Sequence, residues 1–359
     1  MSNSNLVSEF YKRQVDYSKK SFEKGGLLPR RYVFILTNLC NLACSFCFQE
    51  RKKRADRMSS ENWLSLIDQI PTNSRITLTG GEPLVFKTFD KIFSKANKVA
   101  ETNIVTNGLL LDQSKIETLL LEKNFKILGI SIDNIGNTTR DFDKKKWDLL
   151  VDRITKFNLA RKKKNHHALL DIKTVVLDEE IKNLFSIHKF MMERLNADTH
   201  SLQLLKGADI QHSDLMFDFD QIDKKYEAYQ YQNFELLVEQ LNLIKDYDQK
   251  NNFKTFLHPS VIDFNQKAKF NIEDLDFLNN KDHIKEKFST CYSPWSSVHI
   301  NVDGNLFPCM AVPMGNVKTE SLEKIIFSAK FDLFKKKIKD NGTVNGCNRC
   351  GWLKINTHP

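Results

Sequence analysis

Six short runs of apolar and β-branched residues, separated by segments with helical spacing, constrain the fold of this 359-residue chain most strongly. The segment Ser60 to Ile70 illustrates the spacing, because its apolar residues recur as on one face of an amphipathic helix. Strands that alternate with helices predict an α/β fold, in which a parallel sheet carries helices on its outside. The predicted strands are Arg31 to Leu36, Ile76 to Thr79, Thr102 to Val105, Ile127 to Ile132, Leu169 to Val176 and Ser201 to Leu205.

Three cysteines follow the first predicted strand in a CxxxCxxC pattern, at Cys40, Cys44 and Cys47. Three thiolates from one short loop can hold three irons of a 4Fe-4S cube and leave the fourth iron without a protein ligand. A zinc site or a purely structural cluster is the alternative, although zinc sites usually pair CxxC units or add histidines, and no histidine lies near this loop.

A Gly80-Gly81-Glu82-Pro83 motif follows the second predicted strand. Adjacent glycines let a backbone approach a ligand closely, and a carboxylate accepts hydrogen bonds from an amine. Alone, this motif would be a common turn.

Polar residues also end the third and fourth predicted strands. Ser131 and Asp133 are two residues apart and therefore share one face of a strand, so both can reach one ligand. A strand end capped by turn-forming residues is the alternative. Asn107, in Thr106-Asn107-Gly108, is interpreted mainly as part of a turn and secondarily as a cofactor contact.

Together these motifs resemble those of radical S-adenosylmethionine (SAM) enzymes, whose cysteine motif has an aromatic residue before its last cysteine, here Phe46. The resemblance covers about residues 30 to 206. It implies a partial (β/α)6 barrel with SAM chelated to the open iron. It also implies that Gly80 to Pro83 contact the SAM amino group, with Glu82 supplying a carboxylate, and that Ser131 and Asp133 meet the ribose hydroxyls. In a barrel, all these motifs would gather at the carboxyl ends of the strands.

The other four cysteines, Cys291, Cys309, Cys347 and Cys350, form a second set. An Asp-Gly turn signal at residues 303–304 predicts a β-hairpin that brings Cys291 and Cys309 together, while Cys347 and Cys350 close the site from a later loop. A structural zinc with four thiolates is the alternative. The spacing resembles the SPASM extension and its shorter relative, the twitch domain. We expect a small α+β twitch-type domain with one fully ligated auxiliary 4Fe-4S cluster that passes electrons.

Four segments are therefore expected. Residues 1–29 would form a helical extension packed outside the barrel, and residues 30–206 the barrel. Residues 207–288, which include an amphipathic helical pattern over Tyr226 to Tyr247, would form a connector or a cap, and residues 289–359 the cysteine-rich domain.

The composition limits which classes of binding partner are expected. The net charge of +9 comes largely from lysine-rich runs, which are most simply solvated surfaces, with an acidic substrate or an acidic electron donor such as flavodoxin or ferredoxin as the alternative. The sequence lacks interleaved aromatic residues that could stack on bases, so nucleic acid binding is not expected. The chain has no 18-residue apolar run and no signal-peptide pattern at its start, so no membrane association and a cytoplasmic location are expected.

The resemblance implies reductive cleavage of SAM to a 5′-deoxyadenosyl radical, which takes a hydrogen atom from the substrate. Because all seven cysteines are assigned to clusters, none is left to return a hydrogen, and a net two-electron oxidation is favoured over epimerisation. A small polyol, sugar or cyclitol is the expected substrate. The alternatives are a maturase for a ribosomally made peptide or protein, and a non-enzymatic iron-sulfur electron carrier.

Initial hydrogen abstraction requires no catalytic acid or base, so no residue is assigned such a role. Lys173 and Gln203 lie on the last two predicted strands, but alternation along a strand does not reveal which face they take.

Overall fold

The structure is a computed structural model that describes residues 3–49, 57–211 and 214–356. Its centre is a ten-stranded sheet in the order β10-β9-β8-β1-β2-β3-β4-β5-β6-β7. Strands β1 to β7 each run parallel to their neighbour, β8 is parallel to β1, and β9 and β10 continue antiparallel. The strands are β1 (Arg31–Ile35), β2 (Ser74–Thr79), β3 (Ala100–Thr106), β4 (Phe125–Ser131), β5 (Leu169–Val176), β6 (Thr199–Leu204), β7 (Thr255–His258), β8 (Ser297–Ile300), β9 (Asn305–Phe307) and β10 (Gly315–Asn316).

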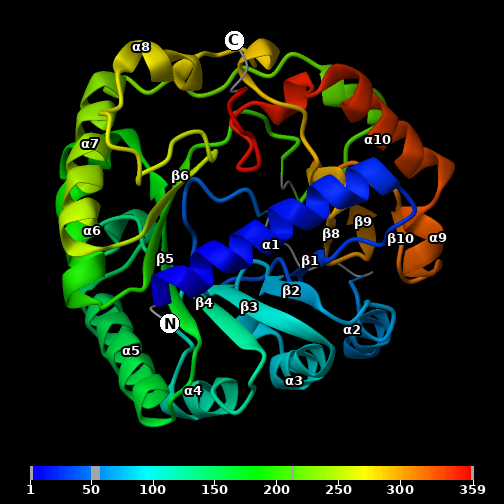
Figure 1. The fold of residues 1–359 in the computed structure, drawn as a ribbon. Helices are drawn as coiled ribbons and strands as arrows, with labels where there is room; N and C mark the ends of the chain where they lie inside the picture. The colour runs from blue at the N-terminus through cyan, green and yellow to red at the C-terminus, as the bar shows by residue number, and fades with distance from the viewer. Residues whose placement is uncertain (1–2, 50–56, 212–213, 357–359) are drawn as a thin grey trace.

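The helices surround the curved sheet (Figure 1), so the expected α/β architecture with a parallel sheet is confirmed. They are α1 (Asn3–Lys24), α2 (Ser60–Ile67), α3 (Phe89–Val99), α4 (Gln113–Leu119), α5 (Lys144–Lys163), α6 (Leu184–Lys189), α7 (Phe234–Asn251), α8 (Ile272–Leu275), α9 (Leu322–Ile326) and α10 (Ala329–Asn341). Single 3-10 or π turns, labelled η, lie between them at Pro83–Val85, Thr138–Arg140, Asp178–Asn183, Phe190–Arg194, Phe219–Asp223, Asp276–Asn279, Lys285–Lys287, Ser293–Trp295 and Asn345–Cys347.

Side-chain caps set where several helices begin. Ser59 accepts a hydrogen bond from the Asn62 backbone amide, and the Asn62 side chain returns one to Ser59, which forms a capping box at the start of α2. Asp112 and Asp143 cap α4 and α5 through single hydrogen bonds to backbone amides. These residues fix the entry of the chain into each helix after the preceding loop.

The main hydrophobic core lies between the outer face of the sheet and its helices. Trp63 of α2 is fully buried against Phe34 of β1, with ring centroids 4.9 Å apart. A second apolar cluster joins β5, β6 and β7 to α7. Because the apolar side chains face outward to the helices, the inner face of the curved sheet is left for polar groups.

Helix α1 lies across the sheet in Figure 1. Its Ser18 hydroxyl is 2.5 Å from the Ser296 hydroxyl, and its Ser21 hydroxyl donates to the Trp295 carbonyl at 2.8 Å. Arg13 reaches Glu101 at the start of β3. The structure thus contains the expected helix in the first 29 residues, and this helix covers the end of the sheet where the strands begin.

The segment 207–288 contributes more than a helical connector, because β7 extends the parallel sheet beyond β6. The sequence did not predict this short strand. The predicted helix over Tyr226 to Tyr247 starts late, since α7 begins at Phe234. The preceding residues are held outside a helix: the Tyr231 hydroxyl donates to the Val176 carbonyl at 2.9 Å, and the Gln232 amide donates to Asp178 at 2.8 Å.

The predicted hairpin at the Asp-Gly turn is present as β8 and β9. Gly304 has φ of +87°, a backbone conformation that glycine adopts without strain. Unexpectedly, β8 also pairs in parallel with β1, with Arg31 opposite Ser297. The cysteine-rich segment therefore shares one continuous sheet with the barrel.

Candidate functional site

The glycines at residues 80 and 81 hold the cysteine loop close to β2. The Gly81 amide donates to the Thr37 carbonyl at 2.6 Å, and the Glu82 amide donates to the Leu39 carbonyl at 2.9 Å. A Cβ atom at either glycine would lie 2.3 Å from one of these two carbonyl oxygens. Such a contact is too short for any side chain, so the motif is needed for backbone packing as well as for any ligand.

Cys40, Cys44 and Cys47 lie on this loop. The Cys47 amide donates to the Cys44 carbonyl at 3.3 Å, and the Leu42 amide donates to the Cys40 sulfur at 3.4 Å. Burial raises the pKa of the Cys40 and Cys44 thiols, and the neighbouring thiols add to the effect. The loop thus carries three sulfur donors on one short segment, which fits a cluster held by three cysteines.

Glu82 is fully buried, and protein donors occupy both of its oxygens. Its Oε1 accepts from the Leu84 amide at 3.0 Å and from the Thr106 hydroxyl at 2.7 Å, while Oε2 accepts from the Asn107 amide at 2.8 Å. Burial raises the pKa of Glu82 to about 7, although these hydrogen bonds oppose the shift. The carboxyl group therefore ties the end of β2 to the end of β3, and its contact with SAM stays a prediction.

Asn107 joins the end of β3 to the cysteine loop. Its amide nitrogen donates to the Asn41 side-chain oxygen at 2.8 Å and lies 3.8 Å from the Cys40 sulfur. Its side-chain oxygen accepts from the Leu109 amide at 2.9 Å, as in a turn. Both interpretations of Asn107 are thus compatible with its geometry.

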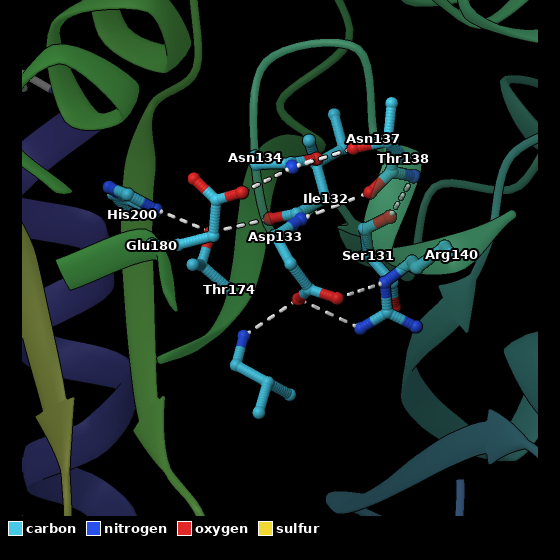
Figure 2. Close-up of polar contacts among 11 residues, drawn as sticks. Ser131, Ile132, Asp133, Asn134, Asn137, Thr138, Arg140, Thr174, Glu180 and His200 are labelled. Atoms are coloured by element: carbon cyan, nitrogen blue, oxygen red, sulfur yellow. Dashed lines mark hydrogen bonds and ion pairs between the residues drawn. The ribbon is translucent and has the colours of Figure 1, made fainter. Parts of the chain in front are cut away.

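Asp133 is also fully buried at the end of β4 (Figure 2). Its Oδ1 accepts from the Val175 amide at 2.8 Å and from Arg140 Nη2 at 3.0 Å, while its Oδ2 lies 2.7 Å from Arg140 Nε. The carbonyl of Ser131 accepts from Asn137 at 3.3 Å. The two residues of the predicted ribose motif thus share one turn, but the Asp133 carboxylate is already bound within the protein.

Arg140 is a site residue that the sequence interpretation missed. Its guanidinium carbon lies 5.2 Å from the centre of the Phe46 ring, within cation–π range. Arg140 also favours the thiolate of Cys44 and so opposes the effect of burial on the pKa of that thiol. One side chain therefore connects the end of β4 to the aromatic residue and to a cysteine of the cluster loop.

A chain of buried side chains continues from this turn to the outer helices. The Thr174 hydroxyl donates to the Ile132 carbonyl at 2.5 Å and lies 2.9 Å from His200 Nε2. His200 Nδ1 is 3.0 Å from His188 Nδ1, and His188 Nε2 is 2.9 Å from Asp248. Because the threonine proton is committed to Ile132, His200 Nε2 must donate to Thr174, and His188 Nδ1 then donates to His200 Nδ1.

Polar side chains of β5 and β6 face the inside of the curved sheet. Lys173 Nζ pairs with Asp171 at 2.6 Å, and the Asp171 carboxylate also accepts from Thr199 at 2.8 Å and Ser201 at 2.9 Å. A Cβ atom at Gly129 would lie 2.8 Å from Lys173 Cε, so the glycine makes room for the lysine. The structure therefore places Lys173 on the face away from α4 and α5.

Gln203 reaches from β6 to β7. Its amide nitrogen donates to the Leu204 carbonyl at 2.8 Å and to the His258 carbonyl at 3.2 Å. Its side-chain oxygen lies near Gly351, where an added Cβ would be 3.7 Å away. Gln203 thus lies where the sheet meets the loop that carries Cys350.

Cys291, Cys309, Cys347 and Cys350 line one common cavity. The Cys291 amide donates to the Gly342 carbonyl at 3.0 Å, and the Cys350 amide donates to the Cys347 carbonyl at 2.8 Å. Burial raises the pKa of Cys291 to about 12 and the pKa values of Cys309 and Cys347 well above the usual range, with further increases from the neighbouring thiols. Four thiols around one cavity, two from buried and two from half-buried cysteines, fit a fully ligated cluster.

Within the described ranges, no three cysteine, histidine or carboxylate side chains are arranged around one point as a preformed metal site. What the chain provides is the loop with three thiols and the cavity with four. In the same part of the chain, no helix is long and apolar enough to span a bilayer.

Lys206 lies between the two cysteine sets. Its Nζ is 5.6 Å from the centre of the Phe48 ring, one residue beyond Cys47. Burial lowers the pKa of Lys206 to about 7, and the nearby Cys350 opposes this shift. A cationic side chain thus lies between the first cysteine loop and the second cavity.

Comparisons with known protein families cover both regions. Residues 34–188 match the model of the radical SAM superfamily, and residues 291–351 match SPASM, an iron-sulfur cluster-binding domain. The two matches contain the three-cysteine loop and the four-cysteine cavity, respectively.

Two curated relatives come from Bacillus subtilis (strain 168). The chain is 24% identical to the antilisterial bacteriocin subtilosin biosynthesis protein AlbA over 318 residues, which is 84% of this chain and 60% of AlbA. It is 35% identical to the sporulation killing factor maturation protein SkfB over 115 residues, which is 31% of this chain and 28% of SkfB. The matches thus span less than two thirds of these relatives.

Solved structures share the fold. SuiB from Streptococcus suis, bound to the precursor peptide SuiA, aligns with a TM-score of 0.58 at 16% identity and covers 91% of this chain and 71% of SuiB. The protein anSMEcpe with bound AdoMet aligns with a TM-score of 0.59 at 18% identity. The alignment covers 90% of this chain and 87% of the anSMEcpe chain. The two family matches imply SAM, a 4Fe-4S cluster and auxiliary iron-sulfur ligation, and the cysteine sets fit these groups. The chain belongs to the radical SAM superfamily and carries a C-terminal SPASM domain.

Proposed function

We propose that this protein modifies a ribosomally made peptide or protein by SAM-dependent radical chemistry. The observation that carries the proposal is the match to AlbA, which extends over 84% of this chain. AlbA is named for bacteriocin biosynthesis, SkfB for maturation of a killing factor, and a further relative is a PqqA peptide cyclase, 28% identical over 113 residues.

The expected oxidation of a polyol, sugar or cyclitol receives less support. Relatives named for nucleotide chemistry are also present, such as an S-adenosylmethionine-dependent nucleotide dehydratase from Selenomonas ruminantium, but this match covers only 29% of the chain. A relative that matches only the barrel says little about the substrate, because one fold hosts many reactions. The peptide alternative is therefore preferred over the small-molecule expectation.

The residues of the site have different proposed roles: some would hold the first cluster, and others would face the substrate. The SAM-binding cluster would be held by Cys40, Cys44 and Cys47. Together, the cluster and SAM would supply a 5′-deoxyadenosyl radical able to take a hydrogen atom. Arg140 and Asn107 fix the cysteine loop against β4 and β3. The inward-facing Lys173, held by the buried Asp171, offers a polar group to the substrate near these strand ends.

The cavity with four cysteines favours net oxidation. Its thiols would hold an auxiliary cluster that has no open iron and so exchanges electrons rather than binding substrate. For each product, the substrate would lose one hydrogen atom to the radical, one proton to solvent and one electron to this centre. An external low-potential one-electron donor of the flavodoxin or ferredoxin class would supply the electron for SAM cleavage. We also propose one auxiliary cluster, because only four cysteines remain outside the first loop.

The test uses the anaerobically reconstituted full chain with SAM, dithionite and synthetic peptides encoded by short reading frames beside its gene. We expect formation of 5′-deoxyadenosine together with a peptide lighter by two hydrogen atoms, measured by mass spectrometry. A panel of polyols and cyclitols serves as the comparison. Oxidation of a polyol, with every peptide unchanged, would contradict the proposal.

A further inference from the structure

A groove of about 820 Å³ runs along β7, the last strand of the sheet. One wall is β7 with the loop at residues 260–265, and the other wall comes from residues 288–290, 292 and 354–356. This groove lies outside both cysteine sites, and neither cluster would occupy it.

Strand β7 pairs only with β6 among the strands of the described ranges. Its second edge therefore has no neighbouring strand and faces the groove. The edge of a strand presents amides and carbonyls at the repeat of an extended chain, so the ligand that matches it is another extended polypeptide.

The opposite wall is itself a short antiparallel ladder. The Ser289 amide donates to the Lys354 carbonyl at 3.0 Å, the Asn356 amide donates to the Lys287 carbonyl at 2.9 Å, and Phe288 forms a bridge with Ile355. No bridge joins this ladder to β7 in the part of the chain that the structure describes. A peptide added to β7 would thus lie between main chain on both sides.

The side chains of the groove match a polar, acidic peptide. Thr255 is only 5% exposed, yet its hydroxyl has no hydrogen-bond partner and lines the groove. Lys254 and Lys354 contribute two positive charges, whereas the single acidic group, Asp263, already accepts two hydrogen bonds from Asn265. The groove therefore offers an unused hydroxyl and an excess of positive charge.

The groove also leads toward the second cysteine site. Its lining includes Thr290 and Tyr292, the residues on either side of Cys291. We propose that the groove binds an extended acidic peptide segment as an added strand on β7 and so holds a peptide substrate beside the SPASM domain. This inference rests on the proposed peptide-modifying function and names the place where the peptide docks.

The test measures binding without turnover. A pool of random peptides of about ten residues, displayed on mRNA, is selected on the reconstituted full chain, and the enriched sequences are synthesised with a fluorophore. We expect acidic sequences whose binding, measured by fluorescence anisotropy, weakens by about tenfold or more in Ser260→Trp, because this exposed residue lines the groove. The matched control Ser114→Trp, on the exposed surface of α4, should bind like the parent.

Charge and backbone are tested separately. Lys254→Glu should weaken binding, whereas Lys269→Glu, which is exposed and outside the groove, should not. N-methylation at alternate peptide positions should abolish binding in one register and spare it in the other, because only every second amide of a strand faces a given edge. If no peptide is enriched, or if Ser260→Trp and Ser114→Trp bind alike, the proposed docking site is wrong.

These outcomes differ from those that test the proposed function. If a peptide is modified but its binding is insensitive to the groove variants, the function stands and this inference fails. If peptides bind in the groove but SAM-dependent modification is seen only with small molecules, the function fails while the binding site stands.

Discussion

Arg140 binds both carboxylate oxygens of Asp133, with Nε 2.7 Å from Oδ2 and Nη2 3.0 Å from Oδ1. The aspartate is fully buried, while the same guanidinium faces the Phe46 ring of the cysteine loop. The end of β4 is thereby linked to the loop that would hold the first cluster, without a ligand in between.

Removing this arginine should both destabilise the protein and loosen the cysteine loop. We expect Arg140→Met to lower the free energy of unfolding by about 3 kcal/mol, because it leaves a buried carboxylate without its partner. Denaturation of the cluster-free protein measures this loss. The double variant Arg140→Met/Asp133→Asn should recover part of the stability but not the iron of the first cluster, since the contact with Phe46 stays absent. Equal stability of the parent and Arg140→Met would contradict the linkage.

Gly81 should not tolerate even a methyl group. In Gly81→Ala the new Cβ would lie 2.3 Å from the Leu39 carbonyl oxygen, so the cysteine loop must shift. We expect loss of iron from the first site, measured by iron analysis of the reconstituted protein. Gly351→Ala is the matched control, because its Cβ would meet its neighbours at ordinary distances of 3.6 Å or more. The control should keep its full iron content.

The two cysteine sets should be separable by iron content and by reaction. The parent chain should bind about eight irons, and Cys347→Ala/Cys350→Ala about four, because each 4Fe-4S cluster holds four. This double variant should still release 5′-deoxyadenosine from SAM but should form no oxidised product. Cys44→Ala should form no 5′-deoxyadenosine. Product formation without the second cysteine set would refute the electron-acceptor role.

His200 should make the protein sensitive to acid. Burial, together with the neighbouring His188, holds the pKa of His200 well below its usual range, so the folded state keeps this ring neutral. The unfolded chain takes up the proton below about pH 6.5, and the stabilisation present above that pH is therefore lost as the pH falls, by up to about 1.4 kcal/mol per pH unit.

The variant His200→Gln should reduce this slope. Denaturant unfolding between pH 7.5 and about pH 5 compares the two proteins in the cluster-free state. The exposed His167, with its ring in a polar loop, provides the control His167→Gln, which should keep the parent slope. An unchanged slope in His200→Gln would show that the buried ring does not carry the effect.

The sequence predicts the six central strands because each contains a short run of apolar and β-branched residues, a pattern that is recognisable without tertiary context. It does not predict β7, whose four residues form part of a sheet only because β6 lies beside them. Likewise, the late start of α7 depends on Asp178 and Tyr231, which hold the preceding residues through contacts distant in sequence.

The cysteine sets and the strand-end motifs could also be recognised, because the residues of each motif are close together in the sequence and so lie on short loops. Arg140 was not, because it ends a single 3-10 turn between two residues with positive φ, Asn137 and Asp141. Nothing in the local sequence shows that this turn folds back over Phe46. The internal hydrogen bonds of Glu82 and Asp133 were hidden for the same reason, as their partners lie on neighbouring strands. The substrate class rests on the match to AlbA rather than on any residue pattern.

The pairing of β1 with β8 has a consequence for biosynthesis. Arg31 and Ser297 are 266 positions apart in the sequence. One edge of β1 therefore stays unpaired until β8 has been synthesised and most of the chain has left the ribosome. Such non-local pairing slows folding and exposes an unpaired strand during synthesis, when a chaperone or low temperature would protect it from aggregation. Iron-sulfur assembly on Cys40, Cys44 and Cys47 would accordingly follow translation, since the barrel that supports this loop is complete only when the SPASM domain has joined it.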